Sequence, residues 1–147
     1  MTRDEILAMV PGPEMDAAVG KAIGATPTVK WYAMNKEETA YCMDFERENT
    51  GNDWLRERIA SFPNSRYEDY HIVRQEIYRQ YSKDISEAWD VVEKLAKEWP
   101  DFCISNYPKG LWSVMWGFDG YGLPSIEATT APLAICRAAL LAKEVPQ

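Results

Sequence analysis

The sequence has little of what most catalytic sites are built from. His71 is the single histidine, and neither a GxSxG motif nor a Cys–His pairing accompanies it, so a nucleophilic triad has no support. The glycines of FDGYG fit a hairpin turn and not the strand-to-helix loop that cradles phosphates. Carboxylates are scattered along solvated faces, which gives no sign of a two-carboxylate hydrolase or a magnesium site. The sequence therefore predicts a protein that is not an enzyme.

Cysteine and long apolar runs are also scarce. Cys42, Cys103 and Cys136 are odd in number and far apart, and no CxxC motif is present, so we expect buried thiols in a reducing compartment, with no metal and no cofactor. No run approaches the length that spans a membrane, and MTRDEILAMVPG has too few apolar residues for a signal peptide. These absences predict a cytoplasmic protein.

Positive charge is in deficit as well. The 147 residues carry 23 acidic and 16 basic side chains, which gives a net charge of −7. Binding to the phosphates of long DNA or RNA needs clustered positive charge and is therefore not expected. A small anionic ligand held by a few local donors remains compatible with this balance. The length predicts one domain that spans residues 1–147.

The clearest element is a helix over residues 81–99. Its apolar residues recur three and four apart, which predicts one buried stripe. Asp84 with Glu87 predicts a capping box at its start, and Pro100 predicts its end. Among its side chains we expect Trp89 in the core, together with Trp116 from a later strand.

The remaining elements follow from the same periodicity rules. Helices are predicted over 3–10, 13–23, 54–62, 66–80 and 131–142, and strands over 28–34, 40–46, 101–107, 111–118 and 121–129. Both faces of the strand 111–118 are largely apolar, which predicts cover on both sides. The fold class is therefore α/β: a three-layer α–β–α sandwich around a small, mainly antiparallel sheet.

Three stretches carry a family resemblance. MTRDEILAMVPGPEMDAAVGKAIG, YSKDISEAWDVVEKL and EATTAPLAICRAALLA, with GLWSVMWGF as a tryptophan-bearing strand, resemble the phage ABA-sandwich domain of bacteriophages and prophages. The resemblance covers residues 1–24 and most of 81–142. It implies a three-layer fold, a phage origin and hence the host cytoplasm, but no established chemistry. Residues 37–80 look like a helical insertion in this frame.

The insertion and its flanks hold more aromatic and arginine side chains than so small a domain needs for its core. Aromatic faces stack on bases, and arginine forks bind phosphates, at about 1–3 kcal/mol per contact. The candidate ligand-binding residues are Trp31, Arg56, Arg58, Tyr70, Arg74, Tyr78 and Trp112. A tyrosine-rich subunit interface uses the same residue types and fits the composition equally well.

By analogy with phage proteins that sequester nucleotide second messengers of bacterial defence, we expect a non-catalytic, homo-oligomeric sponge for a cyclic nucleotide or an ADP-ribose-type signal. A second hypothesis is an inhibitor that binds a basic surface of a host defence protein. Its acidic candidates are Asp44, Glu46, Glu48, Glu68 and Asp69. A third hypothesis is an enzyme that degrades such a signal, which predicts turnover and a product of altered mass.

Overall fold

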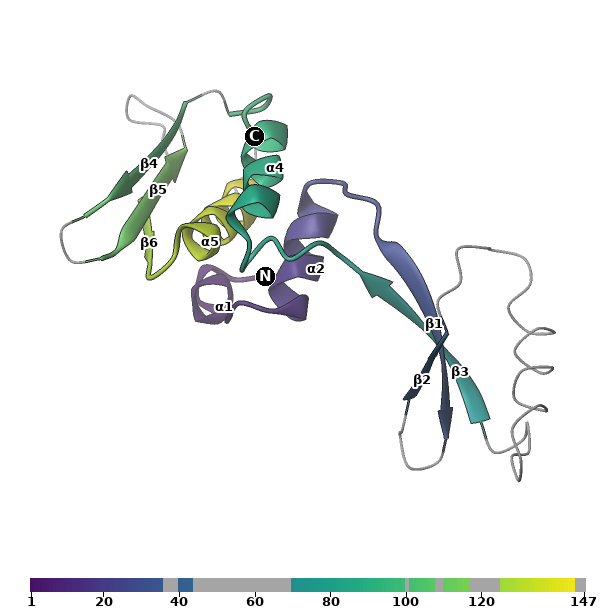
Figure 1. Ribbon diagram of the computed structural model, residues 1–147. Helices are drawn as coiled ribbons and strands as arrows, with labels where there is room; N and C mark the ends of the chain where they lie inside the picture. The colour runs from purple at the N-terminus through teal and green to yellow at the C-terminus, as the bar shows by residue number, and fades with distance from the viewer. Residues whose placement is uncertain (36–39, 44–69, 100, 108–109, 117–124, 145–147) are drawn as a thin grey trace. The chain divides into compact units, whose positions relative to one another are not determined.

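A computed structural model describes residues 1–35, 40–43, 70–99, 101–107, 110–116 and 125–144 (Figure 1). In 31–35, 40–43 and 70–72 it describes the backbone alone. The chain divides into two compact units. Unit 1 combines Met1–Thr26 with Tyr78–Gln147, and unit 2 is Pro27–Ile77. The insertion expected at 37–80 overlaps unit 2, which begins about ten residues earlier in the chain.

Unit 1 begins with two helices, α1 (Arg3–Ala8) and α2 (Pro13–Ala22). A capping box begins α1: the Glu5 N–H donates to Thr2 Oγ1 at 3.3 Å, and the Thr2 N–H donates to the Glu5 carboxylate at 2.7 Å. Two orphan donors of the first turn are thereby satisfied. Gly24 follows α2 with φ +65°, a left-handed conformation that favours glycine.

Helix α4 (Ile85–Leu95) is the helix predicted from residue 81 onwards, but it ends four residues earlier than expected. Asp84 caps it by accepting hydrogen bonds from the N–H groups of Ser86 (2.8 Å) and Glu87 (3.3 Å). The Glu87 carboxylate does not complete a capping box, because it pairs with Arg79. The core assignment of Trp89 is wrong: its side chain lies at the margin of the apolar stripe and is 46% exposed.

A three-stranded antiparallel sheet follows, in the order β4–β5–β6. Its strands are β4 (Phe102–Asn106), β5 (Trp112–Trp116) and β6 (Ile126–Ala128). Val114 and Trp116 of β5 are completely buried, which confirms the core assignment of Trp116. Period-two alternation thus places the aliphatic and aromatic residues of β5 against the core.

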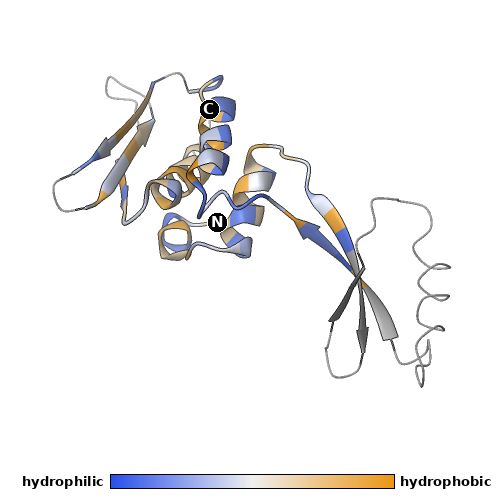
Figure 2. Cartoon of the chain, viewed as in Figure 1, coloured by the Kyte–Doolittle hydropathy of each residue, from blue (hydrophilic) through white to orange (hydrophobic). Residues whose placement is uncertain are grey.

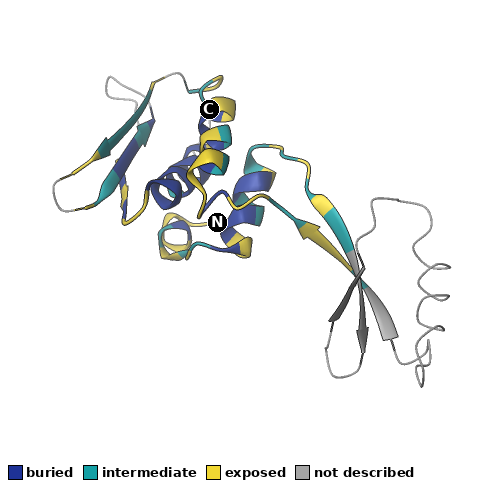
Figure 3. Ribbon diagram, in the orientation of Figure 1, coloured by how far each residue is buried: buried dark blue, intermediate teal, exposed yellow. Residues whose placement is uncertain are grey.

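Helix α5 (Ala131–Glu144) occupies the centre of unit 1. Thr130 Oγ1 accepts a hydrogen bond from the Leu133 N–H at 3.4 Å, so Thr130 caps the helix. Eleven of its fourteen residues are buried, and the helix contacts α1, α2, α4, β5 and β6. Figure 2 shows its apolar composition, and Figure 3 its burial. The helix predicted over 131–142 is confirmed, and the structure shows that it is deeply packed.

The layers of unit 1 follow from these contacts. The sheet packs against α5, and Phe102 of β4 meets Trp89 of α4. The helices α1 and α2 pack against α5 as well (Figure 1). The mixed α/β class is confirmed. The three-layer sandwich, with helices on both faces of one sheet, is not confirmed, because the described helices of unit 1 pack around α5.

Unit 2 holds a second antiparallel sheet in the order β2–β1–β3, formed by β1 (Thr28–Asn35), β2 (Ala40–Met43) and β3 (Tyr70–Ile77). The strands predicted over 28–34 and 40–46 correspond to β1 and β2, which pair as an antiparallel hairpin. The predicted helix over 66–80 is wrong, because β3 pairs with β1 over eight residues, from Thr28↔Ile77 to Asn35↔Tyr70. The helix predicted over 54–62 lies outside the described residues.

None of the helices that the structure describes is both long and apolar enough to cross a membrane.

Candidate ligand-binding site

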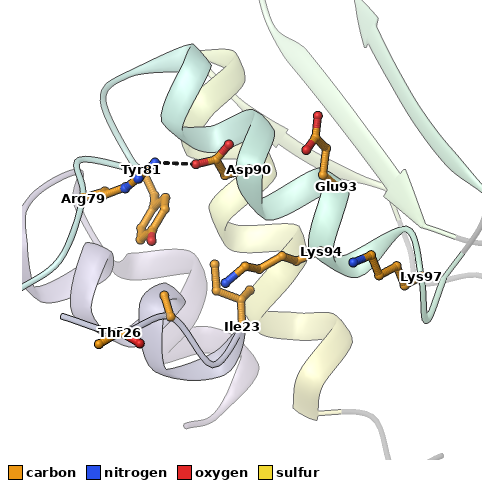
Figure 4. Close-up of a pocket in the computed structure, with 9 residues that line it drawn as sticks. Ile23, Thr26, Arg79, Tyr81, Asp90, Glu93, Lys94 and Lys97 are labelled. Atoms are coloured by element: carbon orange, nitrogen blue, oxygen red, sulfur yellow. Dashed lines mark hydrogen bonds and ion pairs between the residues drawn. The ribbon is translucent and has the colours of Figure 1, made fainter.

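A cleft of about 400 Å³ opens on the surface of unit 1 between the end of α2 and the outer face of α4 (Figure 4). This volume lies in the range of small-molecule sites. The lining residues are Ile23, Ala25, Thr26, Arg79, Tyr81, Asp90, Glu93, Lys94 and Lys97. Charged and hydroxyl groups thus line the cleft together with the apolar Ile23 and Ala25, which suits a small polar ligand.

Hydrogen bonds fix the wall that carries Arg79 and Tyr81. The buried Asp16 of α2 accepts a hydrogen bond from the Ser82 N–H at 2.7 Å, and Ser82 Oγ accepts one from the Gly12 N–H at 2.9 Å. These bonds tie the segment that precedes α4 to the start of α2. The wall is therefore held in place before any ligand arrives.

Arg79 lies at one end of the cleft. Its Nη1 donates to Glu87 Oε2 at 3.1 Å and to Asp90 Oδ2 at 2.7 Å. The hydrogen bond to Glu87, followed by the charges of Glu87 and Asp90, raises the pKa of Arg79 above its ordinary value. Its other guanidinium nitrogens have no partner in the described part of the chain. A guanidinium has five N–H donors, so Arg79 retains donors for a ligand oxygen.

Lys94 and Lys97 supply the other cations. Both are exposed, and neither has an ion-pair partner among the residues that the structure describes. Their spacing of three places them on neighbouring positions of the α4 surface. Figure 4 shows Lys94 extended across the cleft towards Ile23. Two free ammonium groups on one wall favour a ligand with negative charge.

Tyr81 contributes a ring that is 4% exposed and borders the cleft. Burial raises the pKa of its hydroxyl, with Arg79 acting in the opposite direction. The hydroxyl therefore stays protonated near neutral pH, as a possible donor to a ligand. Among the described residues, no group of three or more His, Cys, Asp and Glu side chains could hold a metal ion.

None of the candidate residues that the structure describes lines this cleft. Arg56 and Arg58 lie outside the described residues, and so do the acidic candidates at 44, 46, 48, 68 and 69. Tyr78 and Trp112 lie in unit 1, where both are partly buried and pack against its core. The Tyr78 ring lies directly over Gly20 of α2.

The other three candidates belong to unit 2. Trp31 of β1 is the direct partner of Arg74 of β3, and Asn35 is the partner of Tyr70. Directly paired and alternate residues of an antiparallel ladder share a face, so Trp31, Tyr70 and Arg74 hold positions on one face of this sheet. Arg74 is exposed, and its Nη1 pairs with Glu76 at 2.7 Å.

The fold defines a mixed α/β domain of helices and small antiparallel sheets, with a polar cleft beside α4. The chain belongs to the phage ABA sandwich domain family, whose model matches residues 25–140. This confirms the resemblance, although the matched range begins after α1 and α2 and includes the middle segment 37–80. No curated protein and no solved structure gives a significant match to the chain.

Proposed function

We propose that this phage-family protein binds and sequesters a small nucleotide-derived anion, of the cyclic-nucleotide or ADP-ribose type, without turning it over. The observation that carries the proposal is the cleft of about 400 Å³, in which Lys94 and Lys97 have no ion-pair partner among the described residues and lie beside the anchored Arg79. Sequestration needs only binding and burial of the ligand.

The charge distribution supports an anionic ligand. The chain carries a net charge of −7, yet the cleft gathers three cations and two carboxylates, one of which, Asp90, is already paired with Arg79. Phosphate oxygens would accept hydrogen bonds from the two ammonium groups and from the free nitrogens of Arg79. The Glu93 carboxylate and the Thr26 hydroxyl would accept hydrogen bonds from sugar hydroxyls.

The face positions of Trp31, Tyr70 and Arg74 offer a second location for the same class of ligand. An aromatic surface with an adjacent guanidinium stacks bases and binds phosphate. Because these residues belong to unit 2, substitutions in each unit can separate the two locations.

Calorimetric titration with cyclic dinucleotides and ADP-ribose derivatives tests the proposal. We expect one ligand class to bind, to be released with unchanged mass, and to bind at least tenfold more weakly to the Lys94→Gln/Lys97→Gln variant. Lys83→Gln, which changes an exposed lysine outside the cleft, is the matched control and should bind as the parent does.

Three other results would contradict the cleft or the sequestration function. Loss of binding only in Trp31→Ala or Arg74→Ala would move the site to unit 2 and refute the cleft. A product of altered mass would identify an enzyme. No binding of any tested ligand by a folded protein would refute the sequestration function.

A further inference from the structure

Strand β4 forms an open edge of the sheet in unit 1. It pairs with β5 alone among the strands that the structure describes. Charged residues and proline commonly prevent an edge strand from pairing with another chain. The five residues of β4, FCISN, include neither. The opposite edge differs, since β6 has three residues and carries the exposed Glu127. The composition of β4 is that of a strand suited to further pairing.

The hydrogen-bond pattern shows which backbone groups of β4 face outward. The Tyr107 N–H donates to the Leu111 carbonyl at 2.9 Å, at the end of the β4–β5 hairpin. Hydrogen-bonded pairs of an antiparallel ladder alternate with non-hydrogen-bonded pairs, so Ser105 and Cys103 direct their backbone groups to β5. Phe102, Ile104 and Asn106 therefore present N–H and C=O groups to the open edge.

An exposed apolar ridge lies beside this edge. Ile85 and Trp89, four residues apart on α4, are 51% and 46% exposed. The Trp89 ring meets Phe102 of β4 edge-on, with ring centroids 6.0 Å apart. Tryptophan is among the residues that contribute most to protein interfaces. The ridge and the strand edge thus form one continuous surface.

We propose that a second copy of this chain occupies that surface, through antiparallel pairing of the two β4 strands about a two-fold axis at Ile104. This register pairs Phe102 with Asn106 of the partner subunit and Ile104 with its own copy, so every outward-facing residue of β4 is used. The two sheets become one sheet of six strands. The α4 ridges approach each other on the helical side of that sheet.

Charge does not oppose a copy at this location. Two chains of net charge −7 repel each other over most of their surface. The edge of β4 bears no charge, so self-pairing brings no like charges together along the strand. A symmetric interface needs a self-complementary surface, and an uncharged antiparallel edge is self-complementary in this register.

The register places Cys103 opposite Ser105 of the partner subunit in a non-hydrogen-bonded pair. Such pairs have Cα atoms about 4.5 Å apart, which lies within the range of about 4.4–6.8 Å that a disulfide spans. Cys103 is a free, partly exposed thiol. Ser105→Cys therefore gives two symmetric cross-links if the proposed pairing is correct.

The experiment uses the full chain in a Cys42→Ser background. We expect light scattering to give twice the chain mass of 16.8 kDa, and mild oxidation of Ser105→Cys to give a reducible dimer whose linked peptides join residues 103 and 105. Glu127→Cys on the opposite edge is the control and should stay unlinked. Ser105→Lys should be monomeric, with the circular dichroism of the parent.

A monomeric mass for the parent protein would overturn the proposal. A dimer that persists in Ser105→Lys and does not cross-link in Ser105→Cys would place the interface elsewhere and equally overturn the proposal.

Discussion

Helices α4 and α5 lie side by side in the same unit but differ in what surrounds them. α5 is apolar on nearly every side and contacts helices and strands all round. α4 buries Ala88, Val91, Val92 and Leu95, and turns both an apolar ridge and a charged cleft wall outward. In unit 1, α5 therefore supports the fold, while α4 carries surfaces that are available for binding.

Substitution of one isoleucine in each helix gives the largest expected contrast. Ile135 of α5 is completely buried, so Ile135→Ala should lower the free energy of unfolding by about 2–5 kcal/mol. Ile85 of α4 is 51% exposed in the single chain, so in the monomeric Ser105→Lys background Ile85→Ala should change that free energy by no more than about 0.5 kcal/mol. Urea denaturation measures both values, and equal losses would contradict the difference between the helices.

The packing around α5 predicts an intermediate effect at α2. A Cβ atom on Gly20 would lie 2.0 Å from Cδ1 of Tyr78, so Gly20→Ala must displace the ring and should cost about 1–3 kcal/mol of stability. In Tyr78→Ala the same substitution should lose this penalty, because the ring is absent. A double-mutant cycle by thermal or urea unfolding measures the coupling, and additive effects would show that the contact is unimportant.

The smallest expected effect concerns the start of α4. Hydrogen bonds from the N–H groups of Glu87 and Ser86 lower the pKa of Asp84 from its ordinary value of 3.8. Its contribution to stability is therefore fully present above pH 3.8 and is lost as the pH falls through the lower pKa of the folded state. Asn caps a helix about as well without titrating in this range, so Asp84→Asn should flatten this part of the stability profile.

Urea denaturation at a series of pH values below 5 compares Asp84→Asn with the parent. Glu93→Gln serves as the control, because Glu93 has no hydrogen bond or ion pair within the described part of the chain. A parent and an Asp84→Asn variant with the same acid dependence would show that this cap does not contribute.

Local signals in the sequence predicted most of unit 1. The capping residues Thr2, Asp84 and Thr130 mark where three helices begin, because a cap depends only on neighbours along the chain. The run 131–142 predicted a helix from its periodicity, which is also a property of the local sequence. The exposure of Trp89 could not be predicted, because periodicity identifies a stripe but not how much of the stripe a neighbouring sheet covers.

The error at β3 has a physical explanation. Tyr70, Val73 and Ile77 are spaced as on a helix, yet the segment His71–Ile72–Val73 is rich in residues that favour strands. Eight backbone pairs with β1, distant in sequence, determine the outcome. Tertiary pairing of this kind overrides local spacing.

The candidate cleft was not identified from the sequence, because Lys94 and Lys97 have the spacing of an ordinary solvated helix face. Only the fold brings them near Arg79 and the end of α2. Within the part of the chain that the structure describes, both lysines lack an ion-pair partner, and that feature depends on neighbours in three dimensions.

Arg137, the one charged residue within the apolar run of α5, reaches out of the helix and donates from Nη2 to the Met9 carbonyl at 3.0 Å. That carbonyl belongs to the segment after α1, upstream of the range that the family model matches. A chain that began at residue 25 would therefore leave the Arg137 guanidinium without its acceptor. It would also expose to water a face of α5 that α1 and α2 now cover. For expression and engineering, the chain should therefore begin upstream of residue 25, where the match to the family model starts.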